Sequence, residues 1–374
     1  MEFETTTKIR HFNNNRINPF YRQNIVMHMV GDSLYSQVLS FAGFLPKKVV
    51  YTKDIAPLGS LPRKIDFERL TGIKSHREVG DGQDSVELAY EASIRALKRG
   101  NLEPEDIDLV INCSVSKLDS ERNQILEPSF ASFLVERLGA INADHFDVSN
   151  ACSGMITALK VADMYIKTGM AKHVLVTSGE YISPVIYEAQ KVSFWLNPNA
   201  VPSLSVRDGG GAYLLGVSSD PKMLRFGEPQ TLAQYDSYCA ADAAIGAPGP
   251  RMRTRGKALH KAAIKQLIPS FQRVLKLLEL DWLEIDHIIT HQTSVKVIKR
   301  GNDIAVDAFG QCKCYHICVD ETGNTASTTH AVALEKGLEE NHFNAGEDVL
   351  LHSYGSGLSI FIAHFIIPQG VKSW

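Results

Sequence analysis

The sequence predicts a layered α/β protein built from two copies of one βαβα unit. Apolar, strand-like runs alternate with amphipathic helices beyond residue 34, as in proteins that stack helices on sheets. Several runs, such as IDLVINC at Ile107–Cys113, are apolar at nearly every position, which is typical of strands buried on both faces. The third observation is an internal repeat.

The repeat joins two pairs of segments. Asn101–Ser114 (NLEPEDIDLVINCS) resembles Leu280–Thr293 (LDWLEIDHIITHQT), each with a helix end, an acidic turn, Ile-Asp and an apolar strand. Ala171–Gly179 (AKHVLVTSG) resembles Ala345–Ser353 (AGEDVLLHS). Their matching order favours duplication over chance. We therefore expect an extension at residues 1–34, partly disordered or on the surface, and two halves at 35–218 and 219–374.

The first copy reads as alternating elements. Helix spacing, buried-strand composition and Gly169 as a helix stop predict their order. The expected elements are a strand at 35–45, a helix at 86–97, a strand at 107–113, a helix at 130–138, a short strand at 145–148, a helix with Cys152 in its first turn and Gly169 as its stop, and a strand at 174–177.

Composition limits the function. The chain has 374 residues, 44% hydrophobic, and a formal net charge of -3, so it carries no electrostatic footprint for nucleic acid. No run approaches the roughly 18 apolar residues of a membrane span, and the polar start lacks the apolar core of a signal peptide. We expect a cytoplasmic protein without a membrane span, whose six cysteines are reduced thiols.

Cys152 is the first candidate for chemistry. It lies in DVSNACSGM (Asp147–Met155), where a strand passes into a helix, with Ser149 or Asn150 as the expected cap. Unpaired N–H groups and the helix dipole favour an anion there, and therefore the thiolate. Taken alone, however, a cysteine of this kind is more often a small buried hydrophobic residue.

Five motifs along the chain favour a catalytic role for Cys152. They are Asn150-Ala151-Cys152, RDGGGA at Arg207–Ala212, His291-Gln292-Thr293, Gly323-Asn324-Thr325 and YGSGL at Tyr354–Leu358. Together they resemble the thiolase superfamily, specifically its ketoacyl synthase III branch, over roughly residues 35–374. The resemblance implies a five-layered αβαβα fold, a homodimer and acyl-thioester chemistry. No cofactor is implied beyond acyl-coenzyme A or a phosphopantetheinyl carrier as substrate.

The motif residues make chemical sense in those roles. A thiolate at Cys152 would attack one acyl thioester, and a carbanion formed beside a second thioester carbonyl would then attack the acyl enzyme. The resemblance implies that His291 and Asn324 donate hydrogen bonds to the enolate oxygen of the second substrate. Backbone N–H groups of Cys152 and Ser356 would hold the first oxyanion. Alone, His291 reads equally well as a strand-end histidine and Asn324 as a helix cap.

Glu127 and the residues around it indicate which type of enzyme within the ketoacyl synthase III branch the chain resembles. LEPS at Leu126–Ser129 and GEYISPVIYE at Gly179–Glu188 resemble the OleA-type enzymes, which condense two acyl thioesters head to head in bacterial olefin biosynthesis. In that type, and in related pyrone- and dialkylresorcinol-forming synthases, the matching glutamate crosses the dimer interface and acts as a base. The alternative is a solvated glutamate before a proline.

The delivery of substrate departs from the family pattern. Relatives that use coenzyme A carry Trp and Arg just before their TGI motif, whereas Asp66 and Leu70 precede Thr71 here. This departure favours delivery by an acyl carrier protein. Lys296 keeps a positive charge after His-Gln, where the family often has Arg, and is the candidate for binding phosphopantetheine or an acidic carrier surface.

A metal site is not expected from strand spacing. Cys312, Cys314, His316 and Cys318 alternate on one face of a predicted strand. Same-face residues stand roughly 6.5 Å apart, so four in a row cannot close one tetrahedron.

Three alternatives to non-decarboxylative Claisen condensation remain. One is a synthase III-type decarboxylative condensation with a malonyl thioester. Another is acyl transfer to an alcohol or amine, although such an enzyme has less use for enolate-stabilising donors. The third is a non-catalytic subunit of a heterodimer, which would be expected to lack Cys152 or His291. The sequence specifies neither chain lengths nor the final product.

Overall fold

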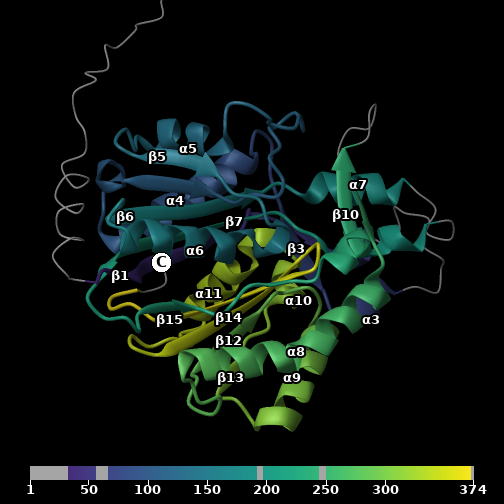
Figure 1. Cartoon of the computed structure of the whole chain (residues 1–374). Helices are drawn as coiled ribbons and strands as arrows, with labels where there is room; N and C mark the ends of the chain where they lie inside the picture. The colour runs from purple at the N-terminus through teal and green to yellow at the C-terminus, as the bar shows by residue number, and fades with distance from the viewer. Residues whose placement is uncertain (1–32, 56–65, 192–196, 244–249, 372–374) are drawn as a thin grey trace, which may run out of the picture.

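The computed structural model describes residues 33–55, 66–191, 197–243 and 250–371. The expected extension at residues 1–34 lies almost entirely outside these ranges. Figure 1 shows the described elements stacked as helices, sheet, helices, sheet and helices, so the expected five-layered αβαβα fold is confirmed.

The two sheets repeat one topology. In the first sheet β4 runs parallel to both β5 and β6, while β7 and β1 continue the sheet in antiparallel fashion. In the second, β12 runs parallel to both β13 and β14, and β15 and β8 continue it in the same way. The internal repeat is thus visible as matching strand order. The strands of the first sheet are β1 (Tyr35–Phe44), β7 (Gly209–Ser218), β6 (His173–Glu180), β4 (Leu109–Asn112) and β5 (Asp144–Asp147); those of the second are β13 (Cys314–Tyr315), β12 (His287–Thr290), β14 (Asp348–Gly355), β15 (Ser359–Ile366) and β8 (Leu224–Phe226), with β9 (Gln230–Thr231) beside β15.

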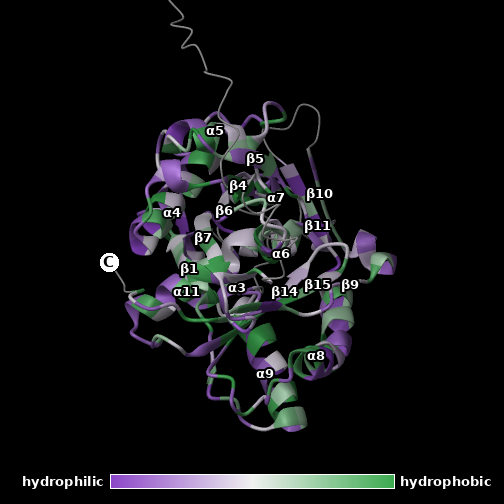
Figure 2. Cartoon of the chain, turned by 60° about the vertical axis from the view of Figure 1, so that its left-hand side comes forward, coloured by the Kyte–Doolittle hydropathy of each residue, from purple (hydrophilic) through white to green (hydrophobic). Residues whose placement is uncertain are grey.

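Helices fill the other three layers. The middle layer holds α6 (Gly154–Lys167) and α11 (Thr329–Glu339), and the outer layers hold α4 (Ser85–Gly100) with α5 (Phe130–Leu138), and α8 (Gly256–Leu278) with α9 (Val295–Phe309). Figure 2 shows hydrophobic and hydrophilic residues alternating along α4 and α8, as expected of helices with one face on the core and one in solvent. No helix in the described ranges is long and apolar enough to cross a membrane.

The middle helices form the core of the protein. The largest apolar cluster joins α6 and α11 to the facing sides of both sheets, with Met155, Leu159, Ile289, Leu334 and Leu351 each at most 1% exposed. Both helices begin with a short 3-10 turn, Ala151–Ser153 before α6 and Ala326–Thr328 before α11. The core therefore brings the two turns together at one level of the molecule.

Smaller elements cover the right-hand side of Figure 1. They carry much of the wall of the cavity described below. They include α3 (Phe67–Thr71), α7 (Ser183–Gln190) and the hairpin β10 (Cys239–Ala243) and β11 (Pro250–Thr254). The other short elements of the described ranges are β2 (Lys48–Tyr51), α2 (Thr52–Ile55), β3 (Ser75–Glu78), α10 (Val319–Thr322), and 3-10 turns at Pro104–Asp106, Pro198–Ser205 and Ala233–Tyr238.

Element boundaries follow local signals closely. The helix expected at 130–138 has those bounds, and Gly139 ends it in the left-handed conformation at φ 78°. The helix expected at 86–97 runs from 85 to 100, because Asp84 caps its start and Asn101 ends it at φ 52°. The helix expected to hold Cys152 in its first turn begins only at Gly154, so Cys152 lies in the 3-10 turn that precedes it.

Candidate active site

One cavity of about 1020 Å³ lies where the two halves meet. Its wall includes Cys152, His291, Asn324, Ser356 and Lys296, which come from five separate stretches of the chain. Of the six residues singled out in the sequence, only Glu127 is not part of this wall. This volume lies just above the range of about 300–1,000 Å³ typical of small-molecule sites.

A strained turn presents Cys152. Ala151 has φ 45°, a left-handed conformation that non-glycine residues adopt rarely. The expected side-chain cap is absent at this turn: Oδ1 of Asn150 accepts from Ser359 Oγ at 3.3 Å, and its amide nitrogen donates to the Thr157 hydroxyl at 2.8 Å. Ser353 of β14 donates to the carbonyl oxygen of Cys152 at 3.2 Å and so ties the turn to the second half.

The surroundings of Cys152 disfavour the thiolate form that the helix start predicts. Burial raises the pKa of the Cys152 thiol above its ordinary value, and nearby Cys239 and Glu180 raise it further, while a backbone hydrogen bond opposes them. Desolvation therefore outweighs the helix start. The thiol is neutral at pH 7, and its proton must be removed when sulfur attacks.

His291 supplies a neutral imidazole to the same cavity. It directly follows β12, and its backbone N–H donates to the carbonyl oxygen of His352 at 2.9 Å. Burial, followed by the charge of His330, lowers the pKa of His291 to about 3. Its buried Nδ1 has no hydrogen-bond partner among the described residues. A neutral ring of this kind can accept a proton or donate one, depending on its tautomer.

Asn324 is held from both sides. Its N–H donates to Ser205 O at 2.9 Å, and its carbonyl accepts from Arg207 N at 2.8 Å. The side-chain Oδ1 accepts from Ala326 N at 3.1 Å, which leaves the Nδ2 group as a donor on the cavity wall. Gly323 is required before it, since φ is +67° and an added Cβ would lie 2.2 Å from Cγ of Arg207.

The turn after β14 closes against the Cys152 turn. A Cβ on Gly355 would lie 2.6 Å from Ser359 Oγ and 2.9 Å from Ser153 Oγ. Neither the Cys152 nor the Ser356 N–H donates to a backbone carbonyl of the described residues. Both groups can therefore serve as donors to an oxygen bound between them.

The β10–β11 hairpin was missed by the sequence reasoning. It contributes Cys239 and Met252 to the wall, and Arg255 and Lys257 follow at the start of α8. The polar–apolar alternation of PRMRT at 250–254 is a strand signal that could have revealed it.

Lys296 is exposed in the first turn of α9. Together with Arg255 and Lys257 it places three cations in the wall of the cavity.

Glu127 lies apart from the cavity of its own chain. It is exposed in the loop between β4 and α5, beside Leu126, which is 79% exposed. Asp147 of β5 anchors the end of that loop by accepting from Phe130 N at 3.0 Å and Ala131 N at 2.9 Å. The loop therefore borders β5, an edge strand of the first sheet.

The chain matches known condensing enzymes along most of its length. Residues 146–228 and 275–366 match the family models of 3-oxoacyl-[acyl-carrier-protein] synthase III and of its C-terminal part. Beta-ketoacyl-[acyl-carrier-protein] synthase III of Caldanaerobacter subterraneus subsp. tengcongensis is 30% identical over 88% of this chain and 96% of its own. The enzyme of the same name from Xylella fastidiosa is 26% identical over 87% and 96%.

Solved structures share the fold. The priming β-ketosynthase of the R1128 polyketide pathway has a TM-score of 0.79 at 24% identity, covering 91% of this chain and 98% of that one. A cysteine-to-serine variant of Xanthomonas campestris OleA, with bound lauric acid and lauroyl-CoA, has a TM-score of 0.77 at 24% identity, covering 89% and 99%.

The fold and the matches define an acyl-condensing acyltransferase of the thiolase superfamily. Within that class the chain belongs to the ketoacyl synthase III family.

Proposed function

We propose that the protein joins two acyl thioesters by Claisen condensation without decarboxylation, through an acyl group carried on Cys152. The observation that carries the proposal is the composition of one large cavity, whose wall presents a thiol, a neutral imidazole and an amide donor. These groups suit both acyl transfer to sulfur and stabilisation of an enolate.

The first step loads the enzyme. The Cys152 sulfur attacks the thioester carbonyl, and the N–H groups of Cys152 and Ser356 hold the oxyanion. Collapse of the tetrahedral intermediate breaks the bond to the leaving thiolate, which takes up the proton released from the Cys152 thiol. The thioester bond is exchanged without an oxidant or a reductant, so this step calls for no cofactor.

The second step makes the carbon–carbon bond. A base removes a proton from the carbon beside the second thioester carbonyl, and the Asn324 amide and His291 donate to the enolate oxygen. The enolate carbon attacks the acyl–Cys152 carbonyl, and the Cys152 sulfur leaves and takes up the proton that the base removed, which regenerates the thiol. The product is a β-ketoacyl thioester, from which pyrone or dialkyl ring products can form.

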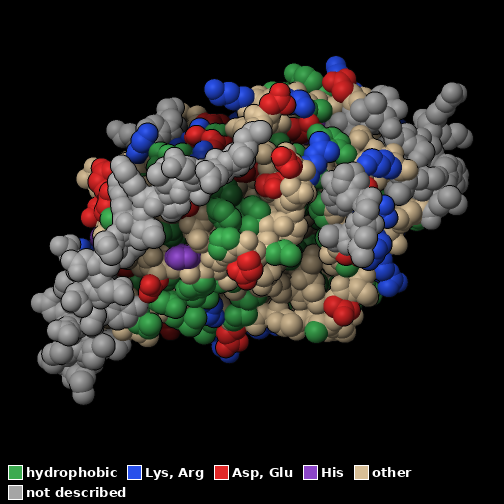
Figure 3. All heavy atoms as spheres, turned by 90° about the horizontal axis from the view of Figure 1, so that it is seen from above, with side chains coloured by type: hydrophobic (Ala, Val, Ile, Leu, Met, Phe, Trp, Pro, Cys, Tyr) green, Lys and Arg blue, Asp and Glu red, His purple; other side chains and the backbone are tan. Residues whose placement is uncertain are grey.

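Glu127 is the proposed base, acting in the cavity of a second subunit of a homodimer. Its exposed position in its own chain fits this role, and β5 beside it is an edge strand with exposed Asp144 and His145. Figure 3, which views the molecule from above, shows hydrophobic side chains gathered near the centre of the visible face among acidic ones. Pairing of two β5 edges would cover such a face and bring Glu127 to the partner.

Substrate delivery by an acyl carrier protein follows from the rim of the cavity. Arg255, Lys257 and Lys296 can bind the phosphate of a phosphopantetheine arm and an acidic carrier surface. In relatives that use coenzyme A, a Trp and an Arg before the TGI motif sandwich the adenine ring. Here Asp66 caps α3 by accepting from Arg69 N at 2.8 Å, and Leu70 is 53% exposed, so neither side chain can stack on an adenine in that way. The bound lauric acid and lauroyl-CoA of OleA support long acyl chains as substrates.

The second candidate is decarboxylative condensation with a malonyl thioester. The names of the curated relatives favour it, because they are β-ketoacyl-[acyl-carrier-protein] synthases III. A malonyl donor forms its carbanion by losing carbon dioxide, so it requires no base at position 127.

Replacing Glu127 by Gln tests the choice between the two. We expect Glu127→Gln to load a long-chain acyl group on Cys152, detected by intact-mass spectrometry, and to fail to condense two acyl thioesters. Glu121→Gln, an exposed glutamate earlier in the same loop, is the matched control and should make product normally. Wild-type product formation by Glu127→Gln, or acceptance of malonyl donors alone by the native enzyme, would establish the second candidate instead.

A further inference from the structure

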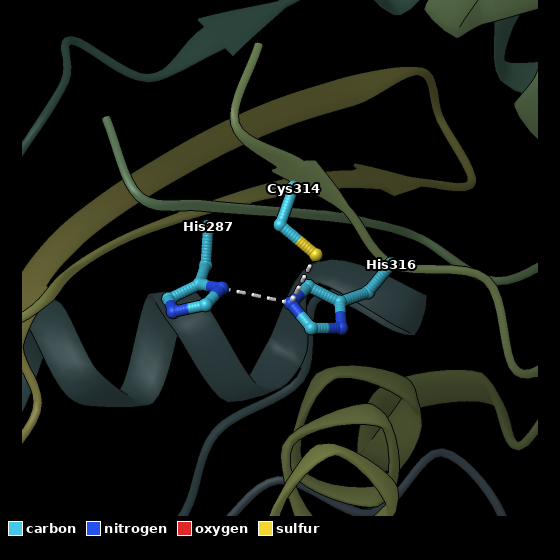
Figure 4. Close-up of side chains that lie close together, drawn as sticks. All are labelled: His287, Cys314 and His316. Atoms are coloured by element: carbon cyan, nitrogen blue, oxygen red, sulfur yellow. Dashed lines mark hydrogen bonds between the residues drawn. The ribbon is translucent and has the colours of Figure 1, made fainter. Parts of the chain in front are cut away.

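Three metal-binding side chains meet at the far end of β12 from the cavity. His287 begins β12, whereas His291 follows its last residue, so the two lie about 13 Å apart along the strand. Cys314 lies directly across from His287 on the neighbouring strand β13, and His316 is two residues further on the same face. Figure 4 shows the three side chains pointing toward one another.

Their donor atoms fit one metal ion. His287 Nδ1 lies 3.1 Å from His316 Nε2, Cys314 Sγ lies 3.4 Å from the same nitrogen, and all three ligand atoms lie within 4.8 Å of one another. In a tetrahedral zinc site, with bonds of about 2.0–2.1 Å to nitrogen and about 2.3 Å to sulfur, neighbouring ligand atoms stand about 3.3–3.6 Å apart. Small adjustments of side chains would place an ion between the three.

The surroundings orient these ligands. Glu347 accepts from His287 Nε2 at 2.8 Å, which leaves Nδ1 with its lone pair toward the cluster. Glu347 is itself fixed by the backbone N–H of Asn344 at 2.6 Å and by its side-chain amide at 2.7 Å. Phe343 packs against both imidazoles, with ring centroids 4.7 Å from His287 and 5.1 Å from His316. A carboxylate behind a histidine and an apolar cover are common features of metal sites.

The cluster differs from the four residues that alternate along 312–318. Cys312 points to Asn302 at 3.8 Å and Cys318 to Gln292 at 3.8 Å, so neither belongs to the cluster. His287, from the adjacent strand, takes their place. An imidazole is also long enough for His316 to reach back toward Cys314 across the strand spacing.

We propose that His287, Cys314 and His316 bind one zinc-like transition-metal ion, with water in the fourth position. A set of two imidazoles and one thiolate suits Zn²⁺ and Co²⁺ and disfavours Mg²⁺ or Ca²⁺. Binding releases the Cys314 thiol proton to solvent. Gln292, next to His291, donates to His316 O at 3.1 Å and accepts from Cys318 N at 3.0 Å. A bound ion would therefore stabilise the segment 314–318, which contacts the residue beside His291 in the cavity wall.

Cobalt titration of the full-length, chelator-treated protein tests this site. We expect a thiolate-to-cobalt charge-transfer band that saturates at one equivalent and disappears when Zn²⁺ is added. Cys314→Ser should abolish the band, and His316→Gln should weaken binding at least tenfold. Cys312→Ser and Cys152→Ser, which remove a neighbouring thiol and the cavity thiol, should keep it.

A second readout does not depend on activity. Zn²⁺ should raise the unfolding temperature of the wild type by several degrees and leave Cys314→Ser unchanged, whereas Mg²⁺ should do nothing. The proposal is wrong if no charge-transfer band forms at one equivalent, if the band survives in folded Cys314→Ser, if folded His316→Gln binds Co²⁺ as tightly as the wild type, or if the band is lost in Cys152→Ser. In those cases the cluster is a hydrogen-bonded group without a metal.

Discussion

Ala151 and Ala326 occupy equivalent places in the two halves and share the left-handed backbone conformation, with φ 45° and 51°. Ala151 directly precedes Cys152, and Ala326 donates its N–H to Oδ1 of Asn324 at 3.1 Å. Each lies in the 3-10 turn that begins a middle helix. The duplication therefore places one strained turn on each side of the cavity, and each turn positions a proposed functional side chain.

This relationship predicts how position 326 tolerates substitution. Ala326→Gly should change the free energy of unfolding by less than about 1 kcal/mol, because relief of the left-handed strain offsets the greater freedom of the unfolded chain. Ala326→Val should cost more than about 2 kcal/mol, because a β-branched side chain is strained at positive φ and position 326 is 2% exposed. Urea unfolding measures both. Equal stability of the two variants would contradict the argument.

The pKa of Cys152 predicts how its reactivity depends on pH. Because burial raises the pKa of the thiol, the thiolate fraction should grow about tenfold for each pH unit across neutral pH. Alkylation of Cys152 by iodoacetamide, followed by peptide mass spectrometry, should therefore accelerate steadily from pH 6 to pH 9. A rate that is already constant above pH 6 would indicate a low thiol pKa and restore the expectation drawn from the helix start.

Much of the fold followed from the sequence because its signals are local. Apolar runs, glycine stops and the repeat predicted the order of strands and helices along the first half and the helix at 130–138. The protonation state of Cys152 did not follow, since it depends on burial by side chains from distant segments, including Cys239 on the β10–β11 hairpin. The contact between His287 and Cys314 could not be predicted either, because residue spacing within one strand does not show which residues lie opposite on the neighbouring strand.

Asn324 is predicted to act after acylation. The enolate oxygen that its amide would stabilise exists only during condensation, and loss of such a donor typically costs about a hundred- to a thousandfold in rate. Asn324→Ala should therefore accumulate acyl enzyme, visible by intact mass, while product nearly vanishes. Cys152→Ala should fail to acylate, and Cys239→Ala, which removes the other cavity thiol, should acylate normally.

Two results would contradict these assignments. If Asn324→Ala lost acylation but condensed normally once pre-acylated, the order of the steps would be reversed. If Cys152→Ala acylated as well as wild type, another residue would be the nucleophile.

The last prediction concerns the subunit to which Glu127 contributes. Glu127 is exposed and lies outside the cavity of its own chain, in a loop whose end is anchored to the edge strand β5. If two β5 edges pair in a homodimer, each cavity would contain Cys152 from one subunit and Glu127 from the other. Cys152→Ala and Glu127→Ala homodimers should then each be inactive in condensation. A mixture allowed to exchange subunits should regain up to about half of the wild-type activity per heterodimer, because one of its two cavities keeps both residues.

Size-exclusion chromatography with light scattering checks that dimers form, and mixing Cys152→Ala with Asn324→Ala is the control for residues that line one and the same cavity. In that heterodimer one cavity lacks Cys152 and the other lacks Asn324, so the control mixture should stay inactive. If the Glu127 mixture also stays inactive although heterodimers form, Glu127 acts within its own subunit or not at all.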